Sequence, residues 1–460
     1  MAAIACKFGG TSVADADQVR KVAAIIRSDP RRRFIVVSAP GKRHREDQKI
    51  TDLLYRCADQ AAAGQDMREL LRIIGERFLS LAAQLGAGLD MAALLEEVQR
   101  RIREGAGRDY AASRGEYLCA RLVADYLGAR YVEAAQTIRF QPDGSLEETT
   151  YSLLAEALSG QGLFVVPGFY GFLPDGSIKT FSRGGSDITG AIVARAVGAE
   201  VYENWTDVSG FLMADPRIVS NPKPMRRITY REMRELACMG ASVLHEEAIF
   251  PVLKEGIPIN IRNTNEPGDP GTMILGEKEA VEGPLAGTVH HPVAGTVRHS
   301  VAGIVRHPVA GIAGKTGFCL LGIAKRLMNR ERGFARRLFE GLEALGIGFE
   351  LVSFGIDSVA VVLGESQLQG KEQALLEALS RALGPESISI QRGLALIAAV
   401  GEGLAGEPRV PALLFSALAQ AEVTPRLIER GSSPSLIIAA VEALKYEQAL
   451  RAVYQALSEL

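Results

Sequence analysis

The sequence predicts an α/β fold on a mainly parallel sheet, followed by two smaller modules of mixed strands and helices. Apolar strand-like runs alternate with amphipathic helical patterns over residues 1–280. Two glycine-rich turns, at Gly9-Gly10 and Gly184-Gly185, each lead from a strand into a helix. From Gly317 to Leu457 a strand, helix, strand, strand order occurs twice. These patterns predict one large α/β domain and a repeated C-terminal unit.

Length, composition and charge restrict the class of protein. A chain of 460 residues has room for two or three domains. Its hydrophobic content of 47% and charged content of 23% exclude wholesale disorder. The net charge of -2 and the pI near 6.4 provide no overall basic field, so we expect no nucleic-acid partner.

The five cysteines are scattered and show no C-x-x-C spacing. This argues against a disulfide framework and a structural zinc site, so we expect no metal site in the protein and a reducing, cytoplasmic location. The N-terminus lacks the basic segment and long apolar run of a signal peptide. No apolar run reaches the roughly 18 residues of a membrane span, so we expect no membrane partner.

The first glycine turn lies inside a predicted βαβ unit. Met1–Cys6 is predicted to be a strand, Val13–Arg27 a helix and Phe34–Ser38 a strand buried on both faces. In sheets of this kind, ligands bind at the carboxyl ends of the strands. Lys7 and Ser38 both lie at such ends, so they are candidate site residues.

The turn itself is Lys7–Ser12. Its consecutive glycines, Gly9 and Gly10, let the backbone approach a ligand closely, and the helix N-terminus that follows favours anions. Lys7 adds a cation and Thr11 adds a hydroxyl. The turn therefore suits a polyphosphate; the alternative is that it only joins the strand to the helix.

The middle of this domain supplies another candidate. Residues 60–106 are predicted to be covering helices, and Arg114-Gly115-Glu116 to open a further helix over Tyr117–Leu127. A carboxylate at a helix start is explained by the helix dipole unless Glu116 faces a cationic group of a substrate. Short strands are predicted near Tyr131-Val132 and within Gly162–Pro167.

The second glycine turn, Phe181–Asp187, precedes an alanine-rich helix over Ile188–Val197. Arg183 offers the bidentate fork that suits a carboxylate, and Asp187 is placed to orient a metal or Lys7. Two such turns, each with a cation and each leading into a helix, fit one site that holds two anionic groups.

These residues resemble the signature set of the aspartate kinases, in the amino-acid kinase superfamily. The resemblance rests on Lys7–Ser12, Phe181–Asp187, and Trp205–Gly210 followed by Asp215-Pro216-Arg217, in the family's order and separation. It implies an α/β/α sandwich kinase domain over residues 1–280. It also implies ATP-dependent phosphorylation of the L-aspartate side chain to 4-phospho-L-aspartate, the first step of lysine, threonine and methionine biosynthesis.

The implied chemistry needs no general base, because the side-chain carboxylate of aspartate is ionised at neutral pH. Catalysis then consists of positioning and of neutralising charge on the γ-phosphoryl group. Mg²⁺ is expected with ATP, bridging phosphate oxygens. The chain has no G-x-x-x-x-G-K-[ST] motif, so its phosphate site is not a P-loop.

The resemblance implies a role for each matched residue. The expected catalytic residues are Lys7, Arg183 and Asp187. The expected aspartate-binding residues are Ser38, Thr51, Glu116, Arg183 and Ser186, with Glu116 on the ammonium group and Arg183 on the α-carboxylate. The expected ATP-binding residues are Lys7, Gly9, Gly10, Thr11, Thr206, Asp207, Asp215 and Arg217. Many relatives carry a nucleotide-binding lysine where this chain has Ser242, and what replaces it is left open.

Residues 281–312 form a predicted linker with a repeat of period eight. It holds four of the six histidines: His290, His291, His299 and His307. We interpret the repeat as a tandem duplication that forms an extended connector, with a histidine metal-binding tract as the alternative.

The C-terminal repeat resembles paired ACT domains, which are ferredoxin-like modules that bind amino acids. We expect one at 313–388 and one at 389–460. The resemblance implies feedback by lysine, threonine or both, and a homodimer or higher homo-oligomer. The implied effector residues are Met328, Arg332, Gly333, Phe334, Glu350, Gly355, Ile356, Asp357 and Ser358. Glu350 stands where lysine-sensitive relatives often have Asp, so the effector is left open; the alternative is that the modules serve dimerisation alone.

Two other functions are weighed against this one. Another carboxylate kinase of the superfamily, such as a glutamate 5-kinase, would not need the paired C-terminal modules. A catalytically silent amino-acid sensor would not need the turns that contain Lys7 and Arg183. No dinucleotide-binding segment follows the second module, so we expect no fusion to a homoserine dehydrogenase.

Overall fold

The computed structural model describes residues 3–182, 184–241, 244, 248, 250–276, 308–430 and 433–460. The chain divides into two compact units. The first unit takes in Met1–Phe211, Pro224–Met233 and Val243–His299. The second takes in Leu212–Lys223, Arg234–Ser242 and Ser300–Leu460. Two short segments of the predicted kinase part are therefore grouped with the C-terminal unit.

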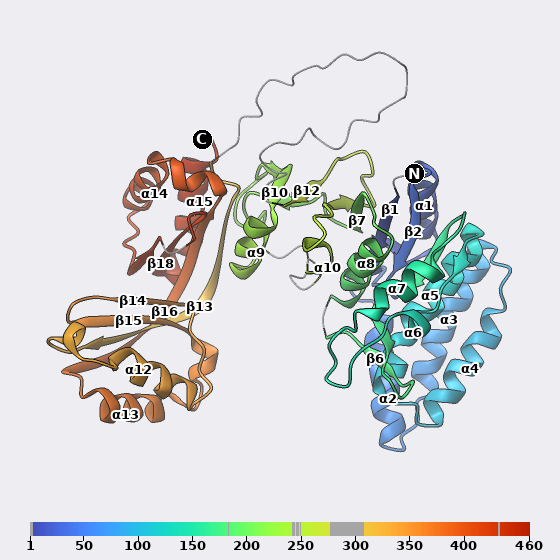
Figure 1. The fold of residues 1–460 in the computed structure, drawn as a ribbon, viewed down its shortest axis with the longest axis horizontal. Helices are drawn as coiled ribbons and strands as arrows, with labels where there is room; N and C mark the ends of the chain where they lie inside the picture. The colour runs from blue at the N-terminus through green and yellow to red at the C-terminus, as the bar shows by residue number, and fades with distance from the viewer. Residues whose placement is uncertain are drawn as a thin grey trace, which may run out of the picture. The chain divides into compact units, whose positions relative to one another are not determined.

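An eight-stranded sheet forms the centre of the first unit, in the order β10-β12-β11-β7-β1-β2-β4-β3 (Figure 1). The strands from β11 to β3 are parallel, and β12 and β10 run the opposite way. The strands span β1 Ile4–Phe8, β2 Arg32–Val37, β3 Arg130–Tyr131, β4 Phe164–Pro167, β7 Val201–Thr206, β10 Arg227–Thr229, β11 Ile259–Asn263 and β12 Thr272–Leu275. The predicted mainly parallel sheet is confirmed.

Helices cover both faces of this sheet. On one face, alternate strand residues such as Cys6, Ile35 and Val165 share a core with the apolar faces of α1 to α5. On the other face α8 packs against β1, β2 and β7, with α7 and α10 beside it. The helices span α1 Ala16–Arg27, α2 Ile50–Ala62, α3 Arg68–Leu85, α4 Met91–Arg103, α5 Arg108–Leu127, α6 Ala134–Thr137, α7 Thr149–Ala157, α8 Gly185–Ala196 and α10 Phe250–Leu253.

Smaller elements connect these layers. The 3₁₀ turn η1 spans Gly10–Val13, and β5 Tyr170–Phe172 pairs with β6 Ile178–Thr180 as a hairpin. The remaining short elements are β8 Phe211–Leu212, β9 Pro224–Met225 and α9 Tyr230–Cys238. No described helix is both long and apolar enough to cross a membrane.

An antiparallel sheet of six strands organises the second unit, in the order β14-β15-β13-β16-β18-β17. Its helices form two separate cores, α12 with α13 and α14 with α15. The bounds are β13 Gly311–Ala324, α12 Phe334–Glu343, β14 Leu351–Phe354, β15 Ser358–Gly364, α13 Glu372–Leu383, β16 Ser387–Val400, α14 Arg409–Gln420, β17 Leu427–Glu429, β18 Leu436–Glu442 and α15 Tyr446–Leu457. Two ACT-type modules on one sheet are therefore confirmed.

The two modules interleave along the chain. The long strands β13 and β16 pair with each other, and each contributes to both halves of the sheet. Phe318–Ala324 of β13 pairs with β15, whereas Leu394–Val400 of β16 pairs with β18. The domain boundaries stay a prediction, and the pairing indicates that the second module also includes Gly311–Thr316 of β13.

The halves of the sheet meet at two glycines. Gly317 in β13 has φ of 92° and Gly393 in β16 has φ of 73°, a region that disfavours side chains. A Cβ at either position would meet nothing within 4 Å, so backbone conformation rather than space explains the glycines. The register between the strands shifts at this level, as in a β-bulge.

Candidate active site

Lys7 lies at the carboxyl end of β1, inside the strand rather than in the turn after it, because β1 continues to Phe8. It is only 7% exposed. Its Nζ lies 2.6 Å from Oδ1 of Asp187 and donates to Oδ1 of Asn204 at 3.3 Å. Nδ2 of Asn204 in turn donates to Oδ1 of Asp187 at 2.9 Å. These three side chains form a closed cluster.

The sheet and α8 position this cluster. Lys7 and Asn204 are register partners on the neighbouring parallel strands β1 and β7, so their side chains point to the same face. Asp187 is in the first turn of α8, and Tyr202 fixes that turn by donating its hydroxyl to the carbonyl of Asp187 at 3.0 Å. No sequence motif identifies Asn204; the signal that identifies it is the register of its strand against the strand of Lys7.

The loops after β1 and β2 touch through their backbones. The N–H of Gly41 donates to the carbonyl of Gly10 at 2.8 Å. A Cβ on Gly41 would lie 2.7 Å from the carbonyl carbon of Gly10, so only glycine permits this approach. The expectation for Gly9 needs revision: its N–H donates to the carbonyl of Trp205 at 2.9 Å and is not available to a phosphate. Thr11 is exposed beside Gly10.

Arg77 of α3 clamps the same two loops. Its Nη2 donates to the carbonyls of Ala14 at 2.8 Å and Gly41 at 2.6 Å, and its Nη1 donates to Asp47 at 2.7 Å. Hydrogen bonds from Arg43 and Arg77 hold the pKa of Asp47 well below its usual range. The apolar pattern of this helix predicts only that it covers the sheet. No local pattern identifies Arg77, because its hydrogen-bond acceptors lie in loops far away in the chain.

Glu116 lies in the middle of α5, which begins at Arg108. The expected helix start at Arg114 is therefore wrong, and the helix dipole does not explain the carboxylate. Glu116 is 5% exposed, and burial raises its pKa to about 8, partly offset by a hydrogen bond from the N–H of Ala39. Its Oε2 is buried without a hydrogen-bond partner among the described residues. A buried acceptor of this kind suits a cationic ligand group.

Gly115 brings three predicted aspartate-binding residues into one neighbourhood. A Cβ there would lie 2.7 Å from Cβ of Ala39 and 3.3 Å from Cγ2 of Ile50, so α5 packs directly on the segment after β2 and on the start of α2. Ser38 precedes Ala39 and Thr51 follows Ile50. Both therefore lie beside the turn of α5 that carries Glu116.

The other predicted substrate residues are placed as follows. Ser186 is in the first turn of α8, and a Cβ on Gly168 after β4 would lie 2.6 Å from its Oγ. Thr206 ends β7, and its hydroxyl donates to Asp207 at 3.2 Å. Asp215 and Arg217 belong to the second unit, where they pair at 2.6 Å. Arg183, Ser242 and the histidine repeat lie outside the described residues.

The structure brings most of the predicted effector residues together. The 3₁₀ turn η3 Met328–Arg330 leads through Arg332 to Gly333, which is the N-cap of α12 with φ of 77° and precedes Phe334, the first residue of the helix. The N–H of Leu327 donates to Asp357 at 2.7 Å, and that of Asn329 donates to the carbonyl of Ile356 at 3.1 Å.

The turn Gly355–Ser358 closes on itself and faces this loop. The N–H of Gly355 donates to the carbonyl of Ser358 at 2.7 Å, and Ile356 is 70% exposed. Glu350 behaves differently, because it accepts from Lys315 of β13 at 3.1 Å. The geometry therefore groups the loop and the turn, with Glu350 in a separate ion pair.

Comparisons with known proteins identify the family. Residues 3–263 match the amino acid kinase family, and residues 397–457 match an ACT domain. The chain belongs to the amino acid kinase family.

Three relatives narrow this assignment. Aspartokinase 3 of Bacillus subtilis is 36% identical over 98% of this chain and 97% of its own length. The aspartate kinase structure of Clostridium acetobutylicum matches with a TM-score of 0.90 and 43% identity, over 99% of this chain and 100% of that one. Aspartokinase III of E. coli, in complex with lysine and aspartate, matches with a TM-score of 0.72 and 26% identity over 99% of each chain. Within its family the chain is therefore an aspartate kinase with C-terminal ACT domains, as predicted.

Proposed function

We propose that this aspartate kinase transfers the γ-phosphoryl group of ATP to the side-chain carboxylate of L-aspartate at the cluster of Lys7, Asp187 and Asn204. The observation that carries the proposal is the nearly buried ammonium of Lys7, at the carboxyl ends of parallel strands and beside the start of α8. A preorganised cation in a water-poor site stabilises charge that develops during phosphoryl transfer. Asp187 and Asn204 hold that cation in place.

For the acceptor, we propose that Glu116 receives the ammonium group of aspartate. Its Oε2 is buried and unpartnered in the described part of the chain, so an ammonium group would supply the missing donor. Ser38, Thr51 and Ser186 would complete this side of the site. The family resemblance supports Arg183 as the partner of the α-carboxylate.

For the nucleotide, the proposed contacts are the N–H of Gly10, the hydroxyl of Thr11, and the side chains of Thr206 and Asp207. Asp215 and Arg217 stay expectations of the family resemblance. E. coli aspartokinase III is described in complex with aspartate and ADP, which supports an adenine nucleotide as the donor. The described residues hold no group of three or more His, Cys, Asp or Glu that could bind a metal ion. We therefore propose that magnesium enters as MgATP, with phosphate oxygens as its main ligands.

Feedback regulation is proposed to use the loop that contains Met328, Arg332, Gly333 and Phe334 together with the turn Gly355–Ser358. The lysine complex of the E. coli relative supports lysine as the effector. A homodimer or higher oligomer through the ACT modules is part of the same proposal. A cytoplasmic location is also proposed, although relatives from Arabidopsis thaliana are described as chloroplastic.

A coupled assay of ADP release tests this function. The full-length enzyme is given MgATP with aspartate or glutamate, with and without lysine and threonine, and hydroxylamine traps the acyl phosphate as a hydroxamate. We expect ADP and hydroxamate with aspartate, little with glutamate, and inhibition by lysine. Equal turnover of glutamate, or ADP release without hydroxamate, would contradict the proposed acceptor. Turnover that lysine leaves unchanged would contradict the proposed effector.

A further inference from the structure

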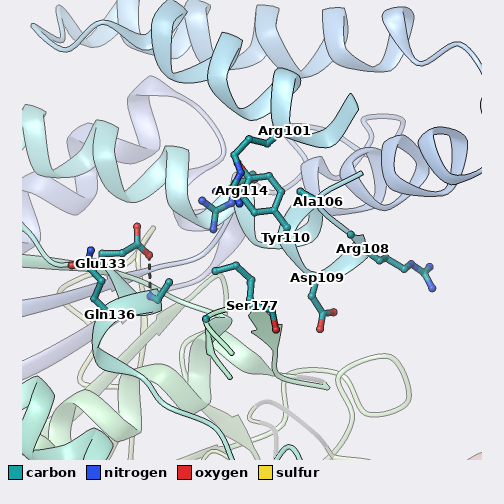
Figure 2. A pocket seen from close by; sticks show the side chains of 13 residues that line it. Arg101, Ala106, Arg108, Asp109, Tyr110, Arg114, Glu133, Gln136 and Ser177 are labelled. Carbon is teal, nitrogen blue, oxygen red and sulfur yellow. Dashed lines mark hydrogen bonds between the residues drawn. The ribbon is translucent and has the colours of Figure 1, made fainter. Parts of the chain in front are cut away.

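A cavity of about 740 Å³ opens in the first unit between α4, α5, α6 and the β5–β6 hairpin (Figure 2). None of the residues in the Lys7 cluster lines it. The residues that matter for its chemistry are Arg101, Arg108, Asp109, Tyr110, Arg114 and Glu133. The cavity is thus a polar, strongly charged space outside the Lys7 cluster.

Arg114 is the most unusual of these residues. It is 6% exposed, and its guanidinium lies 4.5 Å, 4.6 Å and 5.1 Å from the ring centres of Tyr110, Tyr117 and Tyr170. Its side-chain hydrogen bonds both go to the hydroxyl of Ser113, from Nε and Nη2. Among the described residues it forms no ion pair. Burying an unpaired charge costs several kcal/mol, so a bound anion that supplied the counter-ion would stabilise this guanidinium.

Arg101 supplies a second guanidinium at the same place. It lies 4.3 Å from the ring centre of Tyr110, so this ring contacts Arg101 and Arg114 together. Figure 2 shows the three side chains next to one another in the pocket. No described carboxylate pairs with Arg101. Two planar donor groups that line one cavity beside the same ring suit a carboxylate or a phosphate.

The acidic residues of the cavity are already engaged. Glu133 accepts from the hydroxyls of Tyr131 at 2.6 Å and Tyr170 at 2.7 Å, and from the N–H of Ala135 at 3.0 Å. Asp109 accepts from the hydroxyl of Thr180 at 2.9 Å and lies 3.6 Å from Nζ of Lys179.

The third arginine of the cavity has a partner as well. Arg108 pairs with Asp59 at 3.4 Å. The charge without an ion-pair partner among the described residues of the cavity is therefore positive: Arg114 carries it in the buried part, and Arg101 carries it on an exposed side chain.

We propose that this cavity binds a small anion that presents a carboxylate or a phosphate to Arg114 and Arg101, and that the bound anion changes the affinity for aspartate. The predicted effect on aspartate affinity rests on the proposed function; the binding of the anion does not. The anion would bridge α5, which carries Glu116 two residues after Arg114, and the hairpin loop at Gly176–Ile178. Beyond β6 the chain runs directly into the turn that contains Ser186. Both elements that frame the cavity therefore continue into the aspartate site.

Binding is tested on the full-length enzyme with ADP and aspartate present at saturation, so that the catalytic site is filled. Succinate and inorganic phosphate are titrated separately at constant ionic strength, with chloride as the reference, and melting temperature and calorimetric Kd are measured. We expect one or both probes to raise the melting temperature when chloride does not. The probe that binds identifies the ligand as a carboxylate or a phosphate.

Two adjacent arginines of α4 give a matched pair of variants. Arg101→Ala should weaken Kd about 10- to 100-fold, because charge-assisted hydrogen bonds are lost. Arg100→Ala should leave Kd unchanged, since Arg100 pairs with Glu97 and Glu104 and does not line the cavity. Arg114→Met should abolish binding and, without the anion, should unfold at the same or a higher temperature than wild type.

Equal Kd values for Arg101→Ala and Arg100→Ala, or a chloride effect equal to that of the probes, would overturn the site. This comparison decides the matter even if Arg114→Met does not fold. The coupling is tested by the apparent KM for aspartate, which the anion should shift in wild type but not in Arg114→Met. A shift that persists in Arg114→Met would indicate competition at the catalytic site and overturn the coupling. An enzyme that binds the anion but forms no ADP would refute the proposed function alone.

Discussion

The two units of the molecule differ in where they keep their charged side chains. Seven charged residues are buried among the described residues of the first unit: Lys7, Arg32, Arg77, Arg114, Glu116, Glu203 and Glu232. Among the described residues of the second unit no charged residue is buried, and its buried polar side chains are Ser435 and Ser458. Stabilising a transition state requires charges held in place away from water. An effector must bind and leave, and exposed loops with satisfied ion pairs allow that.

The buried charges of the first unit are themselves of two kinds. Glu203 is saturated: it accepts from Arg32 at 2.8 Å and from the indole N–H of Trp205 at 2.9 Å, and lies 3.5 Å from Arg262. Glu116 and Arg114 instead lack, within the described part of the chain, partners that their chemistry requires. Glu203 is therefore a structural residue. Glu116 and Arg114 mark places where a ligand would supply the missing hydrogen-bond or ion-pair partner.

Removing Lys7 should produce the largest loss and is the strongest test of this contrast. Lys7→Ala should lower kcat about 10²- to 10³-fold, because the cation that we propose to stabilise the transferred phosphoryl group is lost. Circular dichroism and the coupled ADP assay measure the fold and the turnover. Arg72→Ala is the control, since Arg72 pairs with Glu69 and Glu76 on the surface of α3. A folded Lys7→Ala enzyme with near-normal turnover would refute the assignment of Lys7.

Arg77 and Arg43 both donate to Asp47, so the two arginines test how much burial adds to the stability that one ion pair contributes. Arg77→Met should lower the free energy of unfolding by about 2–4 kcal/mol, since Asp47 loses its buried partner and the carbonyls of Ala14 and Gly41 lose a donor. Arg43→Ala should cost at most about 1 kcal/mol, because that side chain is half exposed. Urea unfolding measures both. Equal costs would show that burial does not distinguish the two arginines.

Glu116 should give the catalytic unit a characteristic pH dependence. Its pKa of about 8 means that it is largely protonated at neutral pH without substrate. An ammonium group favours the ionised form, so aspartate binding should release a proton, and the KM for aspartate should fall as pH rises from 6 to 8. Glu116→Gln should raise KM about tenfold and remove this trend. A wild-type KM that does not change with pH would contradict the proposed contact.

The same group predicts the direction of the stability change. Its folded pKa lies above the ordinary value of 4.5, so its contribution to stability is complete below about pH 4.5 and is lost as pH rises through about 8. Between pH 5.5 and 8, the free energy of unfolding of the substrate-free enzyme should therefore fall more in wild type than in Glu116→Gln. Parallel pH profiles for the two proteins would argue against a raised pKa.

The smallest effect of a substitution is expected in the second unit, where no charged residue is buried among the described residues. Asp357→Asn should weaken the hydrogen bond to the N–H of Leu327 and raise the lysine concentration for half inhibition severalfold. Inhibition curves for wild type and variant are compared as ratios of activity with and without lysine. Glu377→Gln, on the exposed face of α13, is the control. Identical shifts in both variants would remove Asp357 from the effector site.

The sequence was sufficient for features that local pattern determines. The continuous apolar run at Phe34–Ser38 forms a central strand, β2, and the glycine turns at Gly9-Gly10 and Gly184-Gly185 lie between a strand and a helix as predicted. Lys7 and Asp187 were candidates from these motifs, and the structure places them in contact. Each of these predictions depends on residues that are neighbours in the chain.

What the sequence could not predict depends on partners far away in the chain. Asn204 is identified only through its register with Lys7, and Arg77 only through its acceptors in two loops. In the sequence Arg114 has the pattern of an ordinary helix residue, and only the structure shows the three tyrosine rings around it. The shared strands β13 and β16 were likewise hidden, because pairing across about 70 residues leaves no local periodicity.

The glycine pair at Gly317 and Gly393 has a consequence for how such enzymes diversify. The segment between these glycines, which includes α12 and α13, begins on β13 and ends on β16, and these two strands are neighbours in the sheet. Thr316 and Ala395 are register partners, so a short turn between them would connect the two strands of the second module directly. A segment with neighbouring ends can be inserted, lost or exchanged in one genetic event with little disturbance to its host. If this segment holds the effector site, as we propose, sensitivity to feedback can be gained or lost by one insertion or deletion that leaves the kinase domain unchanged.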